Sequence, residues 1–231
     1  MVATNNMLGL GLYTPAEAAF YARVPVQTLN RWFYGNAQGR LVAEPRFSRD
    51  ERLVTFLDFV QALAIRNARV NYSVPLNTIR EGIDRAKREY AVEYPLARRR
   101  TIHLFGKDLY IELEGADYHK ITGTNRRQGV MKTVVELYMD DLGFDASGVA
   151  NSYVAFKWAR GDAALRTIRM DPSLRLGEPI VENCAISART LWEACQAEGG
   201  LTEAARVYGV DIADVDAACR YIDHLTLPRA A

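Results

Sequence analysis

The sequence predicts an α+β fold that is mainly helical, with helical segments at both ends of the chain and a mixed α/β segment between them. Apolar residues recur at helical spacing before residue 95 and after residue 171, whereas aromatic and β-branched residues flank short glycine turns in the middle. The 231 residues are 49% hydrophobic and 25% charged, which is typical of a globular protein. No apolar run approaches the ~20 residues that span a bilayer, and the first residues lack a secretory signal. We therefore expect a cytoplasmic protein without membrane contact.

The first predicted helix begins at Thr14-Pro15, because Thr14 can cap it and Glu17 can complete a capping box. Val24-Pro25 separates this helix from a second one, whose predicted buried side consists of Val26, Leu29, Trp32 and Phe33. Residues 34–49 contain two glycines and a proline between short apolar pieces, which predicts a small hairpin or wing. Two longer helices are expected after it, one from Leu53 and one from about residue 75 to residue 93.

The middle of the chain is predicted to contain strands as well as a helix. β-Prone residues on both sides of Gly106-Lys107-Asp108 predict a hairpin over residues 101–113. Residues 130–142 are expected to be helical, and residues 153–170 to form two short strands around a turn at 159–162.

Three short helices are predicted near the C-terminal end of the chain. They cover residues 190–197, residues 202–208 with Thr202 as a candidate cap, and a last helix that begins at Asp211. The inward side of the last helix would consist of Val215, Ala218, Tyr221, Ile222 and Leu225. Because a tight glycine turn, Gly199-Gly200, joins the first two helices, the pattern predicts a helix-turn-helix.

Charge is divided unequally along the chain, although the formal net charge is only +1. Residues 1–100 hold 15 Lys and Arg against 9 Asp and Glu, a net charge of +6, and residues 101–231 carry −5. A basic first part and an acidic second part suit a protein that contacts phosphate with the first and a different partner with the second.

The N-terminal segment YTPAEAAFYARVPVQTLNRWF resembles the opening of MerR-type regulators, and the pattern continues through ARVNYSVPLNTIREGI at residues 68–83. The resemblance implies a winged helix-turn-helix DNA-binding domain over residues 10–95, bound to double-stranded DNA as a homodimer. Donor and acceptor side chains on the outer side of the second helix could read base edges, and arginines in the wing could hold phosphates. The candidate DNA-binding residues are Thr14, Gln27, Thr28, Asn30, Arg31, Arg40, Arg46 and Arg49.

The C-terminal segment resembles a small helical domain of VapB-type antitoxins, after a mixed linker domain over residues 96–170. The matching residues, within a domain of residues 171–228, are Asp171-Pro172, Gly177-Glu178-Pro179-Ile180, Thr190, Glu198-Gly199, Ala205, Tyr208 and Leu225. The resemblance implies an antitoxin that masks the acidic metal site of a PIN-like ribonuclease toxin, represses its own operon, and forms a homodimer or a larger complex with the toxin. Candidate partner-binding residues are Arg126, Arg127, Asp214 and Arg229.

No catalytic or cofactor-binding set is expected from the sequence, so we do not expect an enzyme. His103, His119 and His224 are isolated, the cysteines form no metal-ligand pattern, and the glycine-rich nucleotide-binding and hydrolase motifs are missing. Two alternatives remain open beside the antitoxin. One is a stand-alone MerR-like regulator that senses a small molecule in its middle segment, and the other is a protein-interaction adaptor that does not bind DNA.

Overall fold

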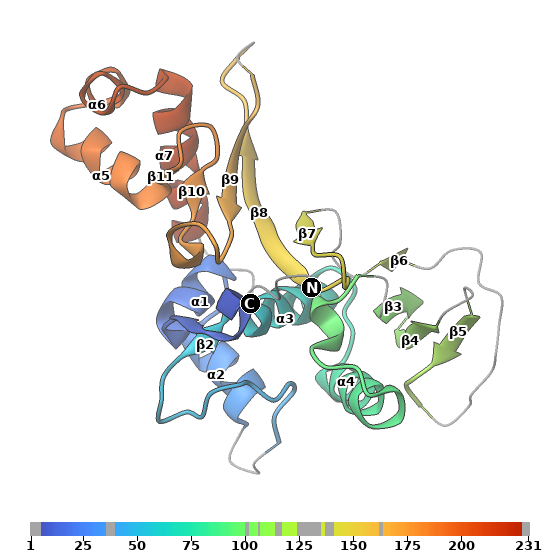
Figure 1. The fold of residues 1–231 in the computed structure, drawn as a ribbon. Helices are drawn as coiled ribbons and strands as arrows, with labels where there is room; N and C mark the ends of the chain where they lie inside the picture. Colours follow the sequence, from blue (N-terminus) through green and yellow to red (C-terminus); the bar gives the residue numbers. More distant parts are fainter. Residues whose placement is uncertain are drawn as a thin grey trace. The chain divides into compact units, whose positions relative to one another are not determined.

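The chain has a mixed α and β architecture in the computed structural model (Figure 1). The structure describes residues 6–35, 40–99, 102–105, 107–113, 117–123, 135–136, 141–161 and 164–227. These residues form seven α-helices and three small sheets. No helix formed by them is both long enough and apolar enough to cross a membrane.

The chain divides into two compact units, which we describe separately. The first unit consists of residues 1–140, 144–150 and 230–231, and the second of residues 141–143 and 151–229. This division differs from the three expected domains, because the middle segment, residues 96–170, is shared between the two units. The two strands expected within residues 153–170 belong to the second unit, where they pair with each other and the second also pairs with a later strand.

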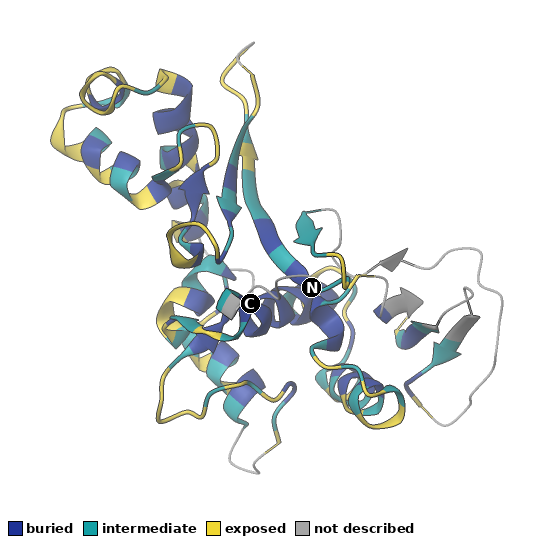
Figure 2. Cartoon of the chain, in the orientation of Figure 1, coloured by how far each residue is buried: buried dark blue, intermediate teal, exposed yellow. Residues whose placement is uncertain are grey.

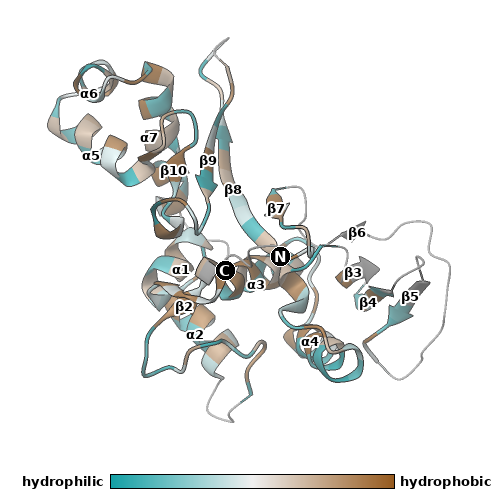
Figure 3. Ribbon diagram, in the orientation of Figure 1, coloured by the Kyte–Doolittle hydropathy of each residue, from teal (hydrophilic) through white to brown (hydrophobic). Residues whose placement is uncertain are grey.

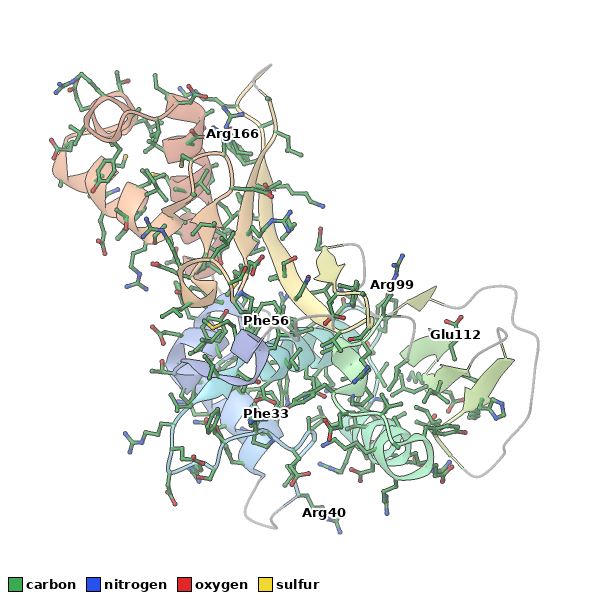
Figure 4. All side chains as sticks on the ribbon, in the orientation of Figure 1. Phe33, Arg40, Phe56, Arg99, Glu112 and Arg166 are labelled. Carbon is green, nitrogen blue, oxygen red and sulfur yellow. The ribbon has the colours of Figure 1, made fainter. Side chains whose placement is uncertain are left out.

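The first unit is built on four helices, α1 (Pro15–Tyr21), α2 (Val26–Tyr34), α3 (Phe56–Val70) and α4 (Leu76–Tyr90). Short 3-10 helices flank them at Asn6–Gly9 (η1) and Pro95–Ala97 (η2). Helix α3 is the centre of the unit, because 12 of its 15 residues are buried (Figure 2). Hydrophobic residues accordingly cover much of α3, whereas α4 carries many hydrophilic residues (Figure 3). Phe33 of α2 and Phe56 of α3 belong to this core, at 1% and 0% exposure (Figure 4).

Capping boxes begin two of these helices. The predicted box at α1 is confirmed: the amide of Glu17 donates to the Thr14 hydroxyl over 3.2 Å, and the amide of Thr14 donates to Glu17 Oε2 over 2.8 Å. A second box, between Thr55 and Asp58, begins α3 and is buried. Both boxes satisfy backbone amides that lack partners within the helix.

The expected hairpin at residues 34–49 is not found among residues 40–49, and residues 36–39 lie outside the described part. The small sheet of this region pairs β1 (Gly11–Tyr13) with β2 (Val54–Thr55) instead. The amides of Val42 and Ala43 donate to the carbonyl of Trp32, over 2.6 and 3.2 Å. The end of α2 therefore satisfies the backbone groups that a hairpin partner would have paired.

A four-stranded antiparallel sheet in the order β5-β4-β3-β6 completes the described part of the first unit. The hairpin predicted at 101–113 is confirmed as β3 (Ile102–Phe105) and β4 (Asp108–Leu113), followed by β5 (Asp117–Lys120). The helix expected at 130–142 is wrong at all four described positions, because β6 (Val135–Glu136) pairs with β3, residue 141 lies in a turn and residue 142 begins another strand. Most of that segment lies outside the described residues. Helix α4 approaches β4 closely at Gly82, where a Cβ atom would lie 2.7 Å from Leu109 Cδ1.

The second unit combines three helices with a five-stranded sheet in the order β11-β10-β9-β8-β7, of which only Phe144 and Ala150 belong to the first unit. The strands are β7 (Leu142–Phe144), β8 (Ala150–Trp158), β9 (Arg166–Met170), β10 (Ile180–Val181) and β11 (Ile186–Ser187), with a 3-10 helix, η3 (Arg175–Gly177), before β10. The helices are α5 (Ala188–Ala197), α6 (Leu201–Tyr208) and α7 (Ile212–Thr226). All five residues predicted to face inward on α7 are buried. Thr202 is not the cap of α6, because that helix begins one residue earlier and Gly200 is its N-cap.

All three cysteines of the chain lie in the second unit as half-buried free thiols. Cys195 of α5 and Cys219 of α7 are within hydrogen-bonding reach of each other. Burial, helped by the Cys195 thiol, raises the pKa of Cys219 to about 12. Burial also raises the pKa of Cys184.

Candidate nucleic-acid interface

Helix α2 presents a polar side to solvent and an aromatic side to the core. Leu29, Trp32 and Phe33 are buried as predicted, whereas Val26 is only half-buried. On the other side Gln27 and Arg31 are exposed, and Thr28 and Asn30 are half-buried. Because Gln27 and Arg31 are four residues apart, their side chains share one side of the helix, and Thr28 and Asn30 lie at its two edges.

Helix α1 packs against α2 through small side chains. Ala18, Ala19 and Ala22 are all at most 1% exposed, which lets the two helices approach closely. The connection of residues 22–25 is tight: the amide of Val24 donates to the carbonyl of Ala19 over 3.0 Å. Arg23 takes a positive φ of 53° within it. The pair of helices is therefore held in a fixed geometry that sets the direction of the polar side of α2.

Thr14 is exposed at the start of α1, but its hydroxyl takes part in the helix cap. The hydroxyl donates to Glu17 Oε2 over 2.8 Å and accepts the amide of Glu17. One acceptor position of the hydroxyl remains for another group. The structure thus gives Thr14 a role in helix initiation, whereas its contact with DNA stays a prediction.

The loop after α2, residues 40–52, carries four exposed arginines, which we call the arginine loop. They are Arg40, Arg46, Arg49 and Arg52. Arg40 extends away from the ribbon (Figure 4). The first three are predicted site residues, whereas Arg52 was missed. The signal that could have found it is the spacing of three between Arg46, Arg49 and Arg52 in RFSRDER. With Glu44, Asp50 and Glu51, the loop carries a net charge of +1.

Hydrogen bonds hold the arginine loop against the core of the first unit. The amide of Arg46 donates to Asp58 Oδ2 over 3.3 Å, and its side chain hydrogen-bonds the hydroxyl of Tyr94. Ser48 donates to Glu51 Oε2 from its amide, over 2.7 Å, and from its hydroxyl, over 2.8 Å, which lowers the pKa of Glu51. The loop is therefore ordered at both Arg46 and Arg49, although it has no strand among its residues.

Asp58 is a buried carboxyl beneath this loop, with 0% exposure. Its Oδ2 accepts the Thr55 hydroxyl over 2.7 Å, while its Oδ1 has no hydrogen-bond partner. Burial raises the pKa of Asp58, against the opposing effect of its hydrogen bonds. Burial also raises the pKa of Tyr34 at the end of α2, and the nearby Asp58 charge adds to this shift.

The predicted partner residue Asp214 is buried inside the second unit, at 1% exposure. It accepts hydrogen bonds from the guanidinium of Arg166 and from Asn183 Nδ2, the latter at 3.0 and 3.2 Å (Figure 4 shows Arg166). The Asp214 hydrogen bond in turn raises the pKa of Arg166. The other candidates, Arg126, Arg127 and Arg229, lie outside the described residues.

The described residues bring together no group of three or more His, Cys, Asp or Glu that could hold a metal ion. His119 and His224 each lie beside an aromatic ring, at centroid distances of 6.3 Å from Tyr90 and 5.4 Å from Phe156. They belong to different units, which are described separately. The side chain of His103 is outside the described part.

No model of a protein family matches this sequence, and no curated protein matches it significantly. The structure is similar to the crystal structure of Rv2018 from Mycobacterium tuberculosis, with a TM-score of 0.61 and 19% sequence identity. The match covers 90% of this chain and 97% of Rv2018. At this identity the similarity shows a shared fold alone, and it covers both units.

Proposed function

We propose that the chain is a double-stranded DNA-binding protein in which α1 and α2 act as a helix-turn-helix. The observation that carries this proposal is the polar side of α2, where Gln27 and Arg31 are exposed opposite the buried Leu29, Trp32 and Phe33. Arg31 has neither a hydrogen bond nor an ion pair in the described part of the structure. Its guanidinium is thus ready to make a bidentate contact with a guanine or a phosphate.

The arginine loop would bind the DNA backbone next to the groove that α2 enters. Guanidinium groups at Arg40, Arg46, Arg49 and Arg52 are suited to phosphate oxygens, which fix the position of a protein on the duplex. Because the net charge of the arginine loop is only +1, a few directed contacts with phosphates would contribute more to DNA affinity than a broad positive electrostatic field. The two half-sites that a dimer reads would be about one helical turn, ~34 Å, apart.

Fluorescence anisotropy with a duplex from the region upstream of the protein's own gene tests this proposal at ~50 mM salt, where phosphate contacts are strongest. Arg31→Ala should weaken binding by about 5- to 100-fold, as expected for a loss of ~1–3 kcal/mol. Arg88→Ala is the matched control, because Arg88 is an exposed arginine on α4, 76% accessible, away from α2. Equal losses in the two variants would contradict the role of α2. No binding by the unmodified chain would favour the adaptor.

We further propose that this DNA-binding protein is an antitoxin, which neutralises a PIN-like ribonuclease and represses its own operon. The support for this part is the resemblance of residues 171–228 to VapB-type antitoxins, together with the acidic second part of the chain. The −5 charge of residues 101–231 makes a protein partner more favourable there than a nucleic acid. Co-expression with the product of the neighbouring gene should give a stable complex and restore growth.

The second unit should be removed as a whole in that assay. A cut at residue 171 would separate β9 from β10, which pair at Arg169 and Ile180. Removing residues 151–231 takes away all of the second unit except residues 141–143, and from the first unit only residues 230–231. This variant should keep DNA binding but lose growth rescue. A neighbour that is harmless, or that is not retained, would contradict the antitoxin part alone.

A stand-alone regulator that senses a small molecule is a second candidate. It is favoured by a cavity of ≈ 470 Å³ beside Arg46 in the first unit. This position differs from the middle segment in which the sequence placed such a sensor.

A further inference from the structure

The cavity beside Arg46 is formed by two separate segments of the first unit. Residues 44–46 of the arginine loop line one part of it, and Lys87 and residues 91–94, at and after the end of α4, line the rest. Its volume of ≈ 470 Å³ lies within the ~300–1,000 Å³ of small-molecule sites.

Three of the residues that line the cavity carry hydrogen-bond donors, namely Arg46, Lys87 and Tyr94. The Arg46 guanidinium bonds the Tyr94 hydroxyl, and Lys87 Nζ lies 3.6 Å from Glu44 Oε2. Burial raises the pKa of Tyr94, so its hydroxyl keeps its proton and can donate. The Lys87–Glu44 pair is weak, because the Glu44 side chain is 77% exposed and such pairs contribute ~0–1 kcal/mol. A ligand carboxylate could therefore replace Glu44 at little cost.

The same cavity also favours a positive charge. Glu44 and Glu93 are both exposed lining residues, and they balance the charges of Arg46 and Lys87. The C-terminal end of α4 adds a negative partial charge, since its last carbonyls have no partner within the helix. A ligand with two negative charges, such as inorganic phosphate, would be repelled by the glutamates, whereas a balanced ligand would satisfy both sets.

Apolar groups complete the lining through Pro45, Ala91, Val92 and the ring of Tyr94. We propose that this cavity binds a small zwitterion with an apolar side group, of the chemical class of a free apolar amino acid. The ligand carboxylate contacts Lys87 and Arg46, and its ammonium group contacts Glu93 near the end of α4. The apolar side group packs against Val92 and Pro45.

Occupancy would affect the arginine loop directly, because Arg46 lines the cavity and its amide is bonded to the buried Asp58. A ligand carboxylate competes with a DNA phosphate for the same guanidinium. This consequence rests on the proposed DNA-binding function, but binding of the zwitterion does not.

Isothermal titration calorimetry of the full chain with L-leucine tests the site without DNA. Isocaproate, which lacks the ammonium group, and isoamylamine, which lacks the carboxylate, are the matched probes. Leucine should bind with a Kd of about 1 mM or tighter, and each probe about tenfold more weakly. No heat of binding from leucine, methionine or phenylalanine at tens of millimolar would overturn the proposal.

Variants assign the binding to this cavity. Lys87→Met keeps the side-chain stem and should weaken leucine and isocaproate by about tenfold, as expected for one charged hydrogen bond. Glu93→Gln should weaken leucine to the level of isocaproate and leave isocaproate unchanged. Arg88→Met, one residue along α4 and outside the cavity, is the control and should bind as the unmodified chain does. If Lys87→Met binds leucine as tightly as the unmodified chain does, and its thermal unfolding is unchanged, the proposed site is overturned.

The effect on DNA is measured separately, by anisotropy with and without saturating leucine. If leucine weakens DNA binding by the unmodified chain but not by Lys87→Met, the result would support regulation through Arg46. Unchanged DNA affinity would overturn the regulation while leaving the ligand site. Absence of DNA binding in both conditions would contradict the proposed function instead.

Discussion

Helix α3 of the first unit and α7 of the second begin with the same local device in contrasting surroundings. Each helix begins with a capping box in which the third helical residue is an aspartate, Asp58 in α3 and Asp214 in α7. The two carboxyls are almost equally buried, at 0% and 1% exposure. Asp214 is paired with Arg166 and Asn183, whereas Asp58 accepts hydrogen bonds only from Thr55 and the Arg46 amide and has an unpartnered Oδ1.

The comparison teaches that a capping motif decides where a helix begins but not how its carboxylate is stabilised. The two residues of a capping box are three positions apart in the chain, so both can be recognised within a short stretch of sequence. Arg166 comes from β9, 48 residues before Asp214, and only the fold brings it there. An ion pair keeps a buried carboxylate charged, while burial without one favours the protonated form.

The largest effect should follow from removing the ion-pair partner. Arg166→Met leaves the Asp214 charge buried without its guanidinium and should lower the free energy of unfolding of the second unit by ~3–5 kcal/mol. Urea denaturation followed by circular dichroism measures this. Arg169→Met, on the same strand, breaks the more exposed pair with Glu182 and should cost no more than ~1 kcal/mol. Similar losses in both variants would show that the burial of Asp214 is not the cause.

A smaller effect should separate the two capping boxes of the first unit. Thr55→Ala removes a buried cap and leaves Asp58 Oδ2 without its hydroxyl donor, so we expect a loss of ~2 kcal/mol. Thr14→Ala removes the exposed cap of α1 and should cost ~0.5–1 kcal/mol. Thermal and urea unfolding of both variants check the difference. A larger loss at Thr14 would contradict the importance of burial.

The smallest change in the free energy of unfolding at neutral pH is expected for Asp58→Asn. The direction in which this change depends on pH is fixed by the raised pKa of Asp58. Because burial raises the pKa of Asp58 above 3.8, its contribution to stability is fully present below that value and is lost as the pH rises through the folded pKa. The unmodified chain should therefore gain stability relative to Asp58→Asn as the pH falls from about 7 toward about 4, by ~1.4 kcal/mol per unit of pKa shift. Parallel pH profiles of the two proteins would show that the pKa is not raised.

Local patterns predicted much of the fold, because their physical causes are themselves local. The α1 capping box, the buried Leu29, Trp32 and Phe33 and the inward side of α7 all follow from spacing within one helix. The hairpin at residues 101–113 follows from a short turn between β-prone runs.

Predictions that depended on distant partners did less well. The loop after α2 contains turn residues that suit a hairpin, but its backbone bonds Trp32 instead. Val135 and Glu136 fit a helical period, yet β3 supplies an edge to pair with. The sequence predicts a surface carboxylate at Asp214, because no residue near it in the chain indicates the contact with Arg166. On the candidate interface, the outer residues of α2 were predictable from helical spacing, whereas the cavity beside Arg46 needed Lys87 and Tyr94 from a distant segment.

The confinement of all cysteines to the second unit has a practical consequence for observing its motions. The thiolate is the form of cysteine that attacks an alkylating reagent, so Cys219, with a pKa of about 12, should react very slowly while α5 and α7 stay packed. Its alkylation rate therefore reports how often those helices separate, in the manner of a hydrogen-exchange measurement at a single site. Since the first unit contains no cysteine, the signal is specific to the second. Partner binding by the second unit would then be read as slower labelling, while events confined to the first unit would leave the rate unchanged.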